Sequence, residues 1–363
     1  MRRLWRSVLD EVTPYEAGPP LERLRAESGP SELIRLSANE NPLGPSPRAI
    51  EAIVAEAARA HLYPDGGGTA LRQALGRHLG VPPEMILLGN GADEVLALIA
   101  WAAFESSNEV VIPHPSFEPY HGVVTLSGAT PVLSPLVDYR TDLDDILRRV
   151  TPRTKALILC SPHNPTGTIL RLGPLRAFLA RLGDDPPLLI LDEAYREFVD
   201  DPDASDGIAL LARCPTLIVL RTFSKVAGLA GLRVGYAVTR AEIVGKLHRV
   251  RAPYNVNRLA QVAAIAALED SEHRELTVRL IREERRFLTR ALSDRGLSVV
   301  PSHANFLLVG VGATATALRQ RLERAGILVR DGAAVGFPGH LRITVGTHAQ
   351  NAKLLAVLDR AQD

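Results

Sequence analysis

The chain has very little cysteine and no long apolar segment. Its 363 residues include two cysteines, Cys160 and Cys214, which are too few for a disulfide framework. The longest fully apolar run, Val95 to Phe104, has ten residues and is too short to span a bilayer. The basic start, residues 1–6, lacks the apolar core of a signal peptide. We therefore expect a cytoplasmic protein with no membrane partner.

Charge of one sign is also lacking. The formal net charge is +1, and the arginines are spread along the chain without a long basic block. The sequence thus gives no reason to expect nucleic acid or an anionic membrane surface as a partner. The cysteines and histidines show no metal-ligand spacing, so no metal site is expected. Hydrophobic residues make up 46% and charged residues 23%, which is ordinary for a globular protein.

The hydrophobic pattern divides the chain into three regions. Residues 1–35 contain four prolines, which prevent one long helix, and we expect them to form an N-terminal arm. Between about 85 and 240, short apolar runs alternate with helical stretches, which indicates βαβ units and a mainly parallel sheet. We expect residues 36–255 to form a large domain. Residues 256–363 would form a smaller α/β domain that closes over the site.

Individual elements can be predicted outside that alternating region. The proline near its start and the apolar spacing favour a helix over residues 46–60, and a second helix is expected over residues 69–79. The end of the chain is predicted to run strand, helix, strand and strand, over residues 297–309, 314–325, 327–330 and 341–345.

Lys225 lies just past the end of a strand that is predicted to be buried. The apolar run Thr216 to Leu220 leads through hydroxyls at Thr222 and Ser224 to the lysine, and Arg233 lies eight positions beyond it. A lone lysine is usually a solvated surface charge, but small residues surround this one. That setting suits a lysine held near an anion and able to form a Schiff base. Arg233 is placed to clamp the same anion.

Three further polar clusters each follow a short apolar run. They are, in chain order, Gly91, Ala92 and Asp93 after residues 85–88, Asn164 after residues 156–160, and Asp192 with Tyr195 after residues 188–191. With Lys225 they make four clusters at the carboxyl ends of four expected strands, where open α/β sheets bind ligands. Taken alone, Asn164 fits an ordinary turn residue and Asp192 fits a residue that caps a helix. Their order and spacing together favour one shared site.

Pyridoxal phosphate requires such a set, because it carries a dianionic phosphate, a ring nitrogen, a phenolate oxygen and an aldehyde. Asp192 would keep the ring nitrogen protonated, so that the ring acts as an electron sink. Asn164 and Tyr195 would hydrogen-bond the phenolate oxygen. The backbone amides of residues 91–93, at the start of a predicted helix, would donate hydrogen bonds to the phosphate. The rest of the cofactor set would be Thr222, Ser224 and Arg233 at the phosphate, and Phe117 on the ring face.

On these residues the chain resembles the class I/II aminotransferases of fold type I, and within them the histidinol-phosphate aminotransferases. Residues 38–45, Ala-Asn-Glu-Asn-Pro-Leu-Gly-Pro, are a strong marker of that branch. The other matching stretches are residues 13–20, 63–65, 254–257, 302–306, 329–331 and 341–346. The resemblance implies an α/β fold in which a seven-stranded, mainly parallel sheet lies between helices, beside a smaller α/β domain and an N-terminal arm.

The resemblance also implies roles for single residues. Tyr63 would reach the cofactor phosphate of the neighbouring subunit, so the active unit would be a homodimer. Arg342 would grip the anionic end of the substrate, a carboxylate or a phosphate, and Arg330 would be a second anion contact. The other residues expected at the substrate site are Tyr15, Asn41, Asn164 and Asn305.

The implied reaction moves an amino group from histidinol phosphate to 2-oxoglutarate, giving glutamate, within histidine biosynthesis. Lys225 would bind the cofactor as a Schiff base and carry a proton between substrate and cofactor carbons, with Asp192 and Tyr195 as its catalytic partners. An aromatic amino acid aminotransferase on the same scaffold is the nearest alternative. A phosphoamino-acid decarboxylase and a cofactor-binding regulator fit residues 38–45 and the complete cofactor set less well.

Three residues depart from the expected pattern. His114 and Glu118 place polar groups on either side of Phe117, where a less charged stretch is expected. His163 stands directly before Asn164, where it would either shift the electrostatics near the ring or point outward. These departures bear on substrate choice and leave the cofactor chemistry unchanged.

Overall fold

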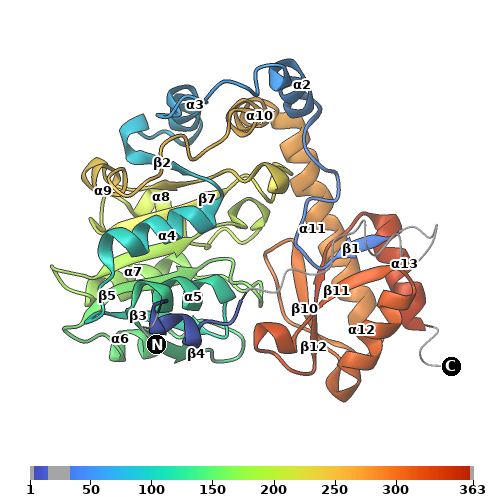
Figure 1. Ribbon diagram of the computed structural model, residues 1–363. Helices are drawn as coiled ribbons and strands as arrows, with labels where there is room; N and C mark the ends of the chain where they lie inside the picture. The colour runs from blue at the N-terminus through green and yellow to red at the C-terminus, as the bar shows by residue number, and fades with distance from the viewer. Residues whose placement is uncertain (1–3, 15–32, 360–363) are drawn as a thin grey trace.

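The computed structural model describes residues 4–14 and 33–359, and its strands form two sheets (Figure 1). The large sheet consists of β2 (Ile86–Gly89), β3 (Glu109–His114), β4 (Thr130–Pro135), β5 (Thr154–Cys160), β6 (Leu188–Asp192), β7 (Leu217–Thr222) and β8 (Gly235–Val238). The small sheet consists of β1 (Ile34–Leu36), β9 (Ser298–Val299), β10 (Phe306–Gly310), β11 (Ile327–Asp331) and β12 (His340–Thr344).

Helices cover both sheets. Those around the large sheet are α2 (Pro47–Ala57), α3 (Thr69–Leu79), α4 (Ala92–Ala103), α5 (Glu118–Ser127), α6 (Leu143–Arg148), α7 (Leu172–Arg181), α8 (Gly207–Leu210), α9 (Ala241–Leu247) and α10 (Arg258–Glu269). Then follow α11 (Ser271–Ser293), α12 (Ala315–Arg324) and α13 (His348–Asp359). We call the large sheet with its helices the large part, and the small sheet with α12 and α13 the small part. No helix of residues 4–14 and 33–359 is long and apolar enough to cross a membrane.

Strand direction decides where the polar clusters lie. The large sheet has the order β2-β8-β7-β6-β5-β3-β4, and β8 pairs antiparallel with both β2 and β7. All its other neighbouring strands pair in parallel. The carboxyl ends of β2, β5, β6 and β7 therefore meet at one edge, together with the start of β8. The predicted α/β fold with a mainly parallel seven-stranded sheet is confirmed.

Alternating side chains of the central strands fill two separate cores. On β6, Leu189 and Leu191 pack with Leu175 of α7, on the face that α3, α7 and α10 cover. Ile190 packs on the opposite face with Leu96 of α4, where α4, α5 and α9 lie. A strand buried on both faces has no polar positions, which explains why these strands read as continuous apolar runs.

The two early helices are confirmed, and one predicted strand is wrong. Ser46 caps α2 by accepting a hydrogen bond from the Ala49 amide at 3.0 Å, and Pro47 follows at the first helical position. The predicted strand over residues 297–309 is instead divided into β9 and β10. Pro301 cannot donate to a strand ladder, and the Ser302 hydroxyl donates to the Phe306 carbonyl at 2.7 Å, which turns the chain between them.

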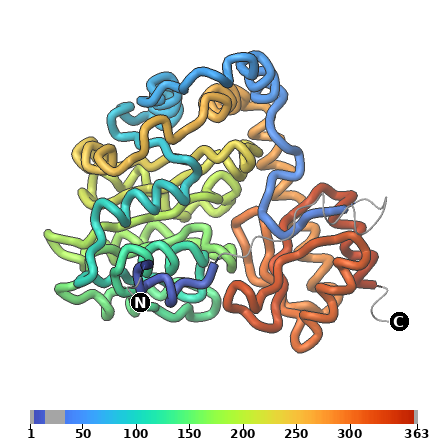
Figure 2. The backbone as a smooth tube through the Cα atoms, in the orientation of Figure 1, coloured from blue at the N-terminus to red at the C-terminus, as the bar shows by residue number. Residues whose placement is uncertain are grey.

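Two segments join the large and small parts. Strand β1 pairs in parallel with β11, and the chain then runs from the small sheet to α2 (Figure 2). Helix α10 packs against α2 and α3, and α11 continues from it to the small part, where Ile281, Leu288 and Leu292 join the core. The domain boundaries at residues 35 and 255 stay a prediction. The part of the arm that is described, residues 4–14, includes the short 3-10 helix Ser7–Glu11, which lies against α5.

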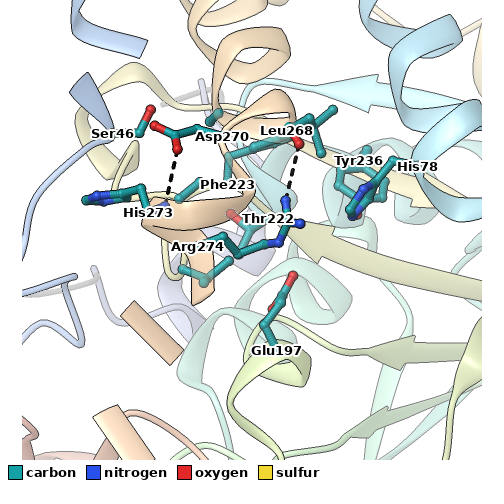
Figure 3. Close-up of a pocket in the computed structure, with 13 residues that line it drawn as sticks. Ser46, His78, Glu197, Thr222, Phe223, Tyr236, Leu268, Asp270, His273 and Arg274 are labelled. Atoms are coloured by element: carbon teal, nitrogen blue, oxygen red, sulfur yellow. Dashed lines mark hydrogen bonds between the residues drawn. The ribbon is translucent and has the colours of Figure 1, made fainter. Parts of the chain in front are cut away.

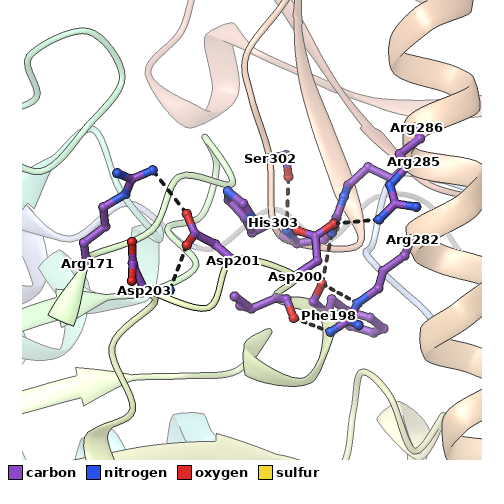
Figure 4. A network of polar contacts seen from close by, with 12 residues as sticks. Arg171, Phe198, Asp200, Asp201, Asp203, Arg282, Arg285, Arg286, Ser302 and His303 are labelled. Atoms are coloured by element: carbon purple, nitrogen blue, oxygen red, sulfur yellow. Dashed lines mark hydrogen bonds and ion pairs between the residues drawn. The ribbon is translucent and has the colours of Figure 1, made fainter.

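Asp200 is the centre of a polar network between the two parts (Figure 4). It follows the 3-10 helix Arg196–Phe198 of the large part, and its carboxylate lies 2.9 Å from Nη2 of Arg285 on α11. Nδ1 of His303, in the small part, lies 2.8 Å from the same carboxylate. Arg285 is 4% exposed and also donates to the Ala304 carbonyl at 2.8 Å. The carboxylate thus balances a buried cation at the junction.

The titration of Asp200 makes this junction sensitive to acid. Burial alone would raise the pKa of Asp200, but Arg285 and His303 outweigh it and hold this pKa below its ordinary value. Because the pKa is lowered in the folded protein, the stabilisation is complete above the unfolded pKa of about 3.9. It is lost as the pH falls through the folded pKa.

We predict that Asp200→Asn lowers the free energy of unfolding at pH 7 by about 1.5–3 kcal/mol, since Arg285 loses a charged acceptor. Urea denaturation should show the same difference at about pH 5 and a smaller one below about pH 4. Asp201→Asn is the matched control, because its partner Arg171 is largely exposed and such pairs contribute about 1 kcal/mol or less. An equal effect of the two substitutions would contradict the assigned role of Asp200.

Candidate active site

The structure brings Lys225, Tyr195, Asn164 and Arg342 together at the shared edge of the large sheet. Nζ of Lys225 lies 5.4 Å from the centroid of the Tyr195 ring. Nδ2 of Asn164 lies 3.5 Å from the Tyr195 hydroxyl. Arg342 reaches in from β12 of the small sheet and donates to Oδ1 of Asn164 at 2.8 Å. The lysine therefore lies between the two parts, among residues that the sequence assigned to cofactor and substrate.

The electrostatic setting of Lys225 favours a reactive amine. Burial, together with the nearby guanidiniums of Arg342 and Arg233, lowers the pKa of Lys225 to about 8, while Asp93 and Asp192 act in the opposite direction. An ordinary lysine has a pKa of about 10.4 and is almost fully protonated at neutral pH. A lysine with a pKa near 8 keeps a useful fraction of neutral, nucleophilic amine.

Asp192 ends β6 with both carboxylate oxygens engaged. Oδ1 accepts from the Ala194 amide at 2.9 Å, and Oδ2 accepts from the Tyr120 hydroxyl at 2.5 Å. Burial raises the pKa of Asp192, and these two hydrogen bonds oppose the rise. A buried carboxylate of this kind is stabilised by a cationic partner, and a protonated pyridine nitrogen is one.

Tyr120 was missed in the sequence analysis. It is almost fully buried on α5, three residues after Phe117. Residues three apart share one face of a helix, so a polar aromatic at this spacing from the expected ring stacker was the available signal. The Phe117 and Tyr120 rings meet edge to face with centroids 5.4 Å apart.

The start of α4 and the guanidinium of Arg233 form a cradle for an anion. Ala92 opens the helix, and no side chain caps it, so its first amides remain available. Nη2 of Arg233 lies 2.9 Å from Oδ2 of Asp93. Gly91 has φ +81°, and a Cβ at this position would collide with the Arg233 guanidinium. Glycine at position 91 therefore lets the arginine lie against the helix start.

Two hydroxyls lie on the same edge of the sheet, at the last residue of β7 and two residues beyond it. The Thr222 hydroxyl donates to Oγ of Ser224 at 2.9 Å, and the Ser224 amide donates to the Thr222 hydroxyl at 3.0 Å. Arg233 itself has φ +54°, in the left-handed region that non-glycine residues rarely adopt. Such backbone conformations cluster at functional sites. Two hydroxyls, free helix amides and a guanidinium are suitable donors for a phosphate.

The asparagines expected at the substrate site hold the marker stretch, residues 38–45, in place. Nδ2 of Asn305 donates to the Asn39 carbonyl at 3.0 Å, and Nδ2 of Asn41 donates to the Val226 carbonyl, next to Lys225, at 2.9 Å. Asn39, which the sequence analysis did not single out, donates to the Tyr195 hydroxyl at 3.1 Å. These contacts give the stretch a positioning role, and the direct substrate contacts of Asn41 and Asn305 stay a prediction.

Arg330 and Arg342 lie opposite each other on neighbouring strands. They form a cross-strand pair of β11 and β12, and such partners point to the same face of a sheet. Like charges placed directly opposite are unfavourable, so this pair favours an anion nearby. Nη2 of Arg330 lies 3.4 Å from Oε1 of Glu118, and Nη2 of Arg342 donates to the Ser37 carbonyl at 2.8 Å.

The remaining predicted positions lie away from this centre or outside the described residues. Tyr63 is 77% exposed and stacks on Tyr254 with ring centroids 4.6 Å apart. Its predicted reach into a neighbouring subunit stays a prediction. Tyr15 lies outside the described residues.

His163 is buried beside Asn164, with its Nδ1 2.9 Å from the Thr166 hydroxyl. Burial lowers the pKa of His163 to about 3, so this residue adds no charge beside Asn164.

A small pocket of about 50 Å³ lies beside Thr222 (Figure 3). Thr222 and Val226 line it from the β7 side, and Glu197, His78 and Arg274 place charged or titratable groups around it. Binding sites for small molecules usually measure about 300–1,000 Å³. The cavity has room for about one or two waters and is too small for a cofactor.

Comparisons with known proteins agree with this geometry. The model of the family "Aminotransferase class I and II" matches residues 31–358. The chain is 43% identical over 358 residues to a histidinol-phosphate aminotransferase of Symbiobacterium thermophilum, covering 98% of each chain. It is 43% identical to another from Anaeromyxobacter sp., covering 96% of each. The crystal structure of histidinol-phosphate aminotransferase from Sinorhizobium meliloti with pyridoxal-5'-phosphate matches with a TM-score of 0.89 and 31% identity, over 99% of this chain and 98% of that one.

A mainly parallel sheet that gathers a lysine, a carboxylate and an anion cradle at one edge defines the fold-type I enzymes that use pyridoxal phosphate. The chain belongs to the class I and II aminotransferase family. The residues present suit this cofactor, since each of its polar groups has a partner of matching charge or hydrogen-bonding type at the shared edge.

We predict that Gly91→Ala weakens cofactor binding at least about tenfold, because the new methyl group displaces Arg233 from the helix start. Titration of the cofactor-free protein with pyridoxal phosphate measures the affinity. The matched control is Gly173→Ala on α7, where a Cβ meets nothing within 4 Å. An affinity unchanged by Gly91→Ala would show that Arg233 does not hold the phosphate.

Proposed function

We propose that this protein transfers the amino group of histidinol phosphate to 2-oxoglutarate, with pyridoxal phosphate as cofactor, in histidine biosynthesis. The observation that carries the proposal is the meeting of Lys225, Asp192 and the Arg330–Arg342 pair at one site. The names of the two bacterial relatives and of the Sinorhizobium meliloti structure support the choice of substrate.

The proposed cofactor contacts follow from the donor set. Bound pyridoxal phosphate supplies an aldehyde that captures amino groups and a protonated ring that stabilises negative charge on the substrate carbon. Asp192 keeps the ring nitrogen protonated, and Asn164 with Tyr195 holds the phenolate oxygen. The phosphate is held by Arg233, Thr222, Ser224 and the amides of Ala92 and Asp93, and Phe117 covers the ring. The Gly91 amide, which the sequence analysis also assigned to the phosphate, donates instead to the Gly89 carbonyl at 2.8 Å.

Lys225 has two roles in the proposal. Its amine anchors the cofactor, and after displacement by the substrate amine it acts as the general base that moves a proton from the substrate carbon. A general base works best when its pKa lies near the working pH, and the lowered pKa of Lys225 meets this condition. Tyr195 lies under the lysine and limits where the amine can move.

The two opposed arginines favour a phosphate over a carboxylate as the anion of the amino donor. A phosphate dianion offers three oxygens and up to two charges, which suit two guanidiniums. The single carboxylate of an aromatic amino acid requires one. Arg330 and Arg342 are thus compatible with histidinol phosphate, although the two carboxylates of 2-oxoglutarate also suit them, and aromatic transamination remains the competing assignment on the same scaffold.

We also propose a cytoplasmic homodimer as the active unit. Ile50, Val54, Leu62 and Tyr63 expose apolar surface on and beside α2, with 69% of Val54 and 77% of Tyr63 accessible. Exposed apolar surface of this kind commonly marks a protein interface. Sedimentation at the dimer mass, and loss of cofactor affinity in Tyr63→Ala, would support the proposal. A monomer with full cofactor affinity would reject it.

The function is tested by a single half-reaction. We predict that the cofactor-loaded protein loses its visible absorbance rapidly with low concentrations of histidinol phosphate and slowly with phenylalanine. Lys225→Ala should stay folded and lose turnover by at least about 10²- to 10⁴-fold. Lys246→Ala, an exposed lysine on α9, is the matched control. Faster conversion by phenylalanine would assign the protein to aromatic transamination, and turnover in Lys225→Ala would overturn the mechanism.

A further inference from the structure

We propose that Tyr120 is a positioning residue that fixes Asp192 and Phe117 for the cofactor ring. The inference rests on the proposed function and deepens it. Tyr120 has one contact to the group assigned to the ring nitrogen and another to the group assigned to the ring face. The Tyr120 side chain thus links the residue at the ring nitrogen of the cofactor to the residue that covers the face of the cofactor ring.

The first contact sets the orientation of the carboxylate. The Tyr120 hydroxyl donates to Oδ2 of Asp192 at 2.5 Å, and the Ala194 amide donates to Oδ1 at 2.9 Å. Donors on both oxygens prevent the carboxylate from rotating about its terminal torsion, which is otherwise broad. Because Tyr120 is 1% exposed, water does not compete for this bond. This arrangement fixes the direction of the remaining lone pairs of Asp192, which are the ones available to the ring nitrogen of the cofactor.

The second contact sets the position of Phe117. Phe117 is the residue before α5, and Tyr120 is the third residue of that helix. Their rings meet edge to face at 80° with centroids 5.4 Å apart, a favoured aromatic geometry. Phe117 itself is only half-buried, so the fully buried tyrosine is the more rigid partner. A displacement of Tyr120 would therefore move both Asp192 and Phe117.

The charges around Asp192 make the tyrosine hydroxyl important. Burial and Asp93 raise the pKa of Asp192 and so disfavour the ionised carboxylate, while Lys225 favours it. Cys160, the cross-strand partner of Asp192 on β5, is also buried, and burial raises the pKa of its thiol, so it stays neutral. Burial and the Asp192 charge raise the pKa of Tyr120 well above its ordinary value, so it remains a donor. Tyr120 and Ala194 supply the hydrogen bonds to the carboxylate within the described residues.

Removal of the hydroxyl makes Asp192 more basic. A carboxylate that loses a charge-assisted hydrogen bond holds a proton more tightly. With the cofactor bound, a more basic Asp192 would compete for the proton of the ring nitrogen, which would weaken the electron sink that the cofactor supplies. The link between Lys225 and the cofactor then titrates at higher pH, because the positive charge on the ring is smaller.

The test compares Tyr120→Phe with Tyr236→Phe. Both substitutions remove a hydroxyl from a buried tyrosine, but Tyr236 lies on β8 with its ring tilted against Phe223, and the partner of its hydroxyl is Arg221 rather than Asp192. For Tyr120→Phe we expect a fall in kcat of about tenfold, the effect of one such hydrogen bond, with KM for the amino donor nearly unchanged. We also expect weaker binding of pyridoxal phosphate to the cofactor-free protein. The pH midpoint of the bound cofactor's absorbance should move upward, and Tyr236→Phe should change none of these values.

The possible outcomes separate the inference from the proposed function. If the wild-type protein does not bind pyridoxal phosphate through Lys225, the proposed function fails first. If the wild-type protein does so, and Tyr120→Phe matches Tyr236→Phe in affinity, pH midpoint and kcat, the inference alone is overturned.

A double variant keeps the inference testable if Tyr120→Phe does not fold, because Asp192→Asn removes the buried charge. Compared with Asp192→Asn alone, the double variant should show nearly the same pH midpoint and kcat, since the effects of coupled residues are non-additive. A full tenfold loss in that background would show that Tyr120 acts independently of Asp192, which would also overturn the inference.

Discussion

The constraint on which the rest of the structure depends is the common direction of β2, β5, β6 and β7. Parallel ladders join β5, β6 and β7, and β2 shares their direction because the antiparallel β8 lies between β2 and β7, so four chain segments far apart in sequence end at one edge of the sheet. Strand β8 runs the other way, so that Arg233, at its start, joins the same edge. A reversal of any one of these strands would move its polar cluster to the opposite edge, and the site would lose a component.

The site also depends on a balance of buried charges. Burial, together with Arg342 and Arg233, lowers the pKa of Lys225, and Tyr120 with the Ala194 amide limits the rise that burial causes in the pKa of Asp192. Arg342 comes from the small sheet and contacts Asn164 of the large part, so contact between the two parts contributes to the lowered pKa of Lys225. The Asp200 network at the other side of the junction holds α11 against the large part. Reactivity and the contact between the parts are therefore linked.

Much of this arrangement follows from local patterns in the sequence. Continuous apolar runs predicted the central strands, Ser46 with Pro47 predicted the start of α2, and the residues after each strand predicted the members of the site. The contacts of Tyr120 with Asp192 and of Asn39 with Tyr195 could not be predicted, because they depend on side-chain directions across distant elements. The break between β9 and β10 was missed because the apolar residues on the two sides of Pro301 and the polar segment Ser302 to Asn305 were joined into one strand.

The central claim is that Lys225 is the residue that binds the cofactor at this edge. The most direct test is to load the protein with pyridoxal phosphate, reduce it with borohydride, digest it and map the modified peptide by mass spectrometry. The account predicts one pyridoxyl group, on Lys225, and its loss in the presence of excess amino donor. Modification of another lysine, or no modification of a protein that binds the cofactor, would contradict it.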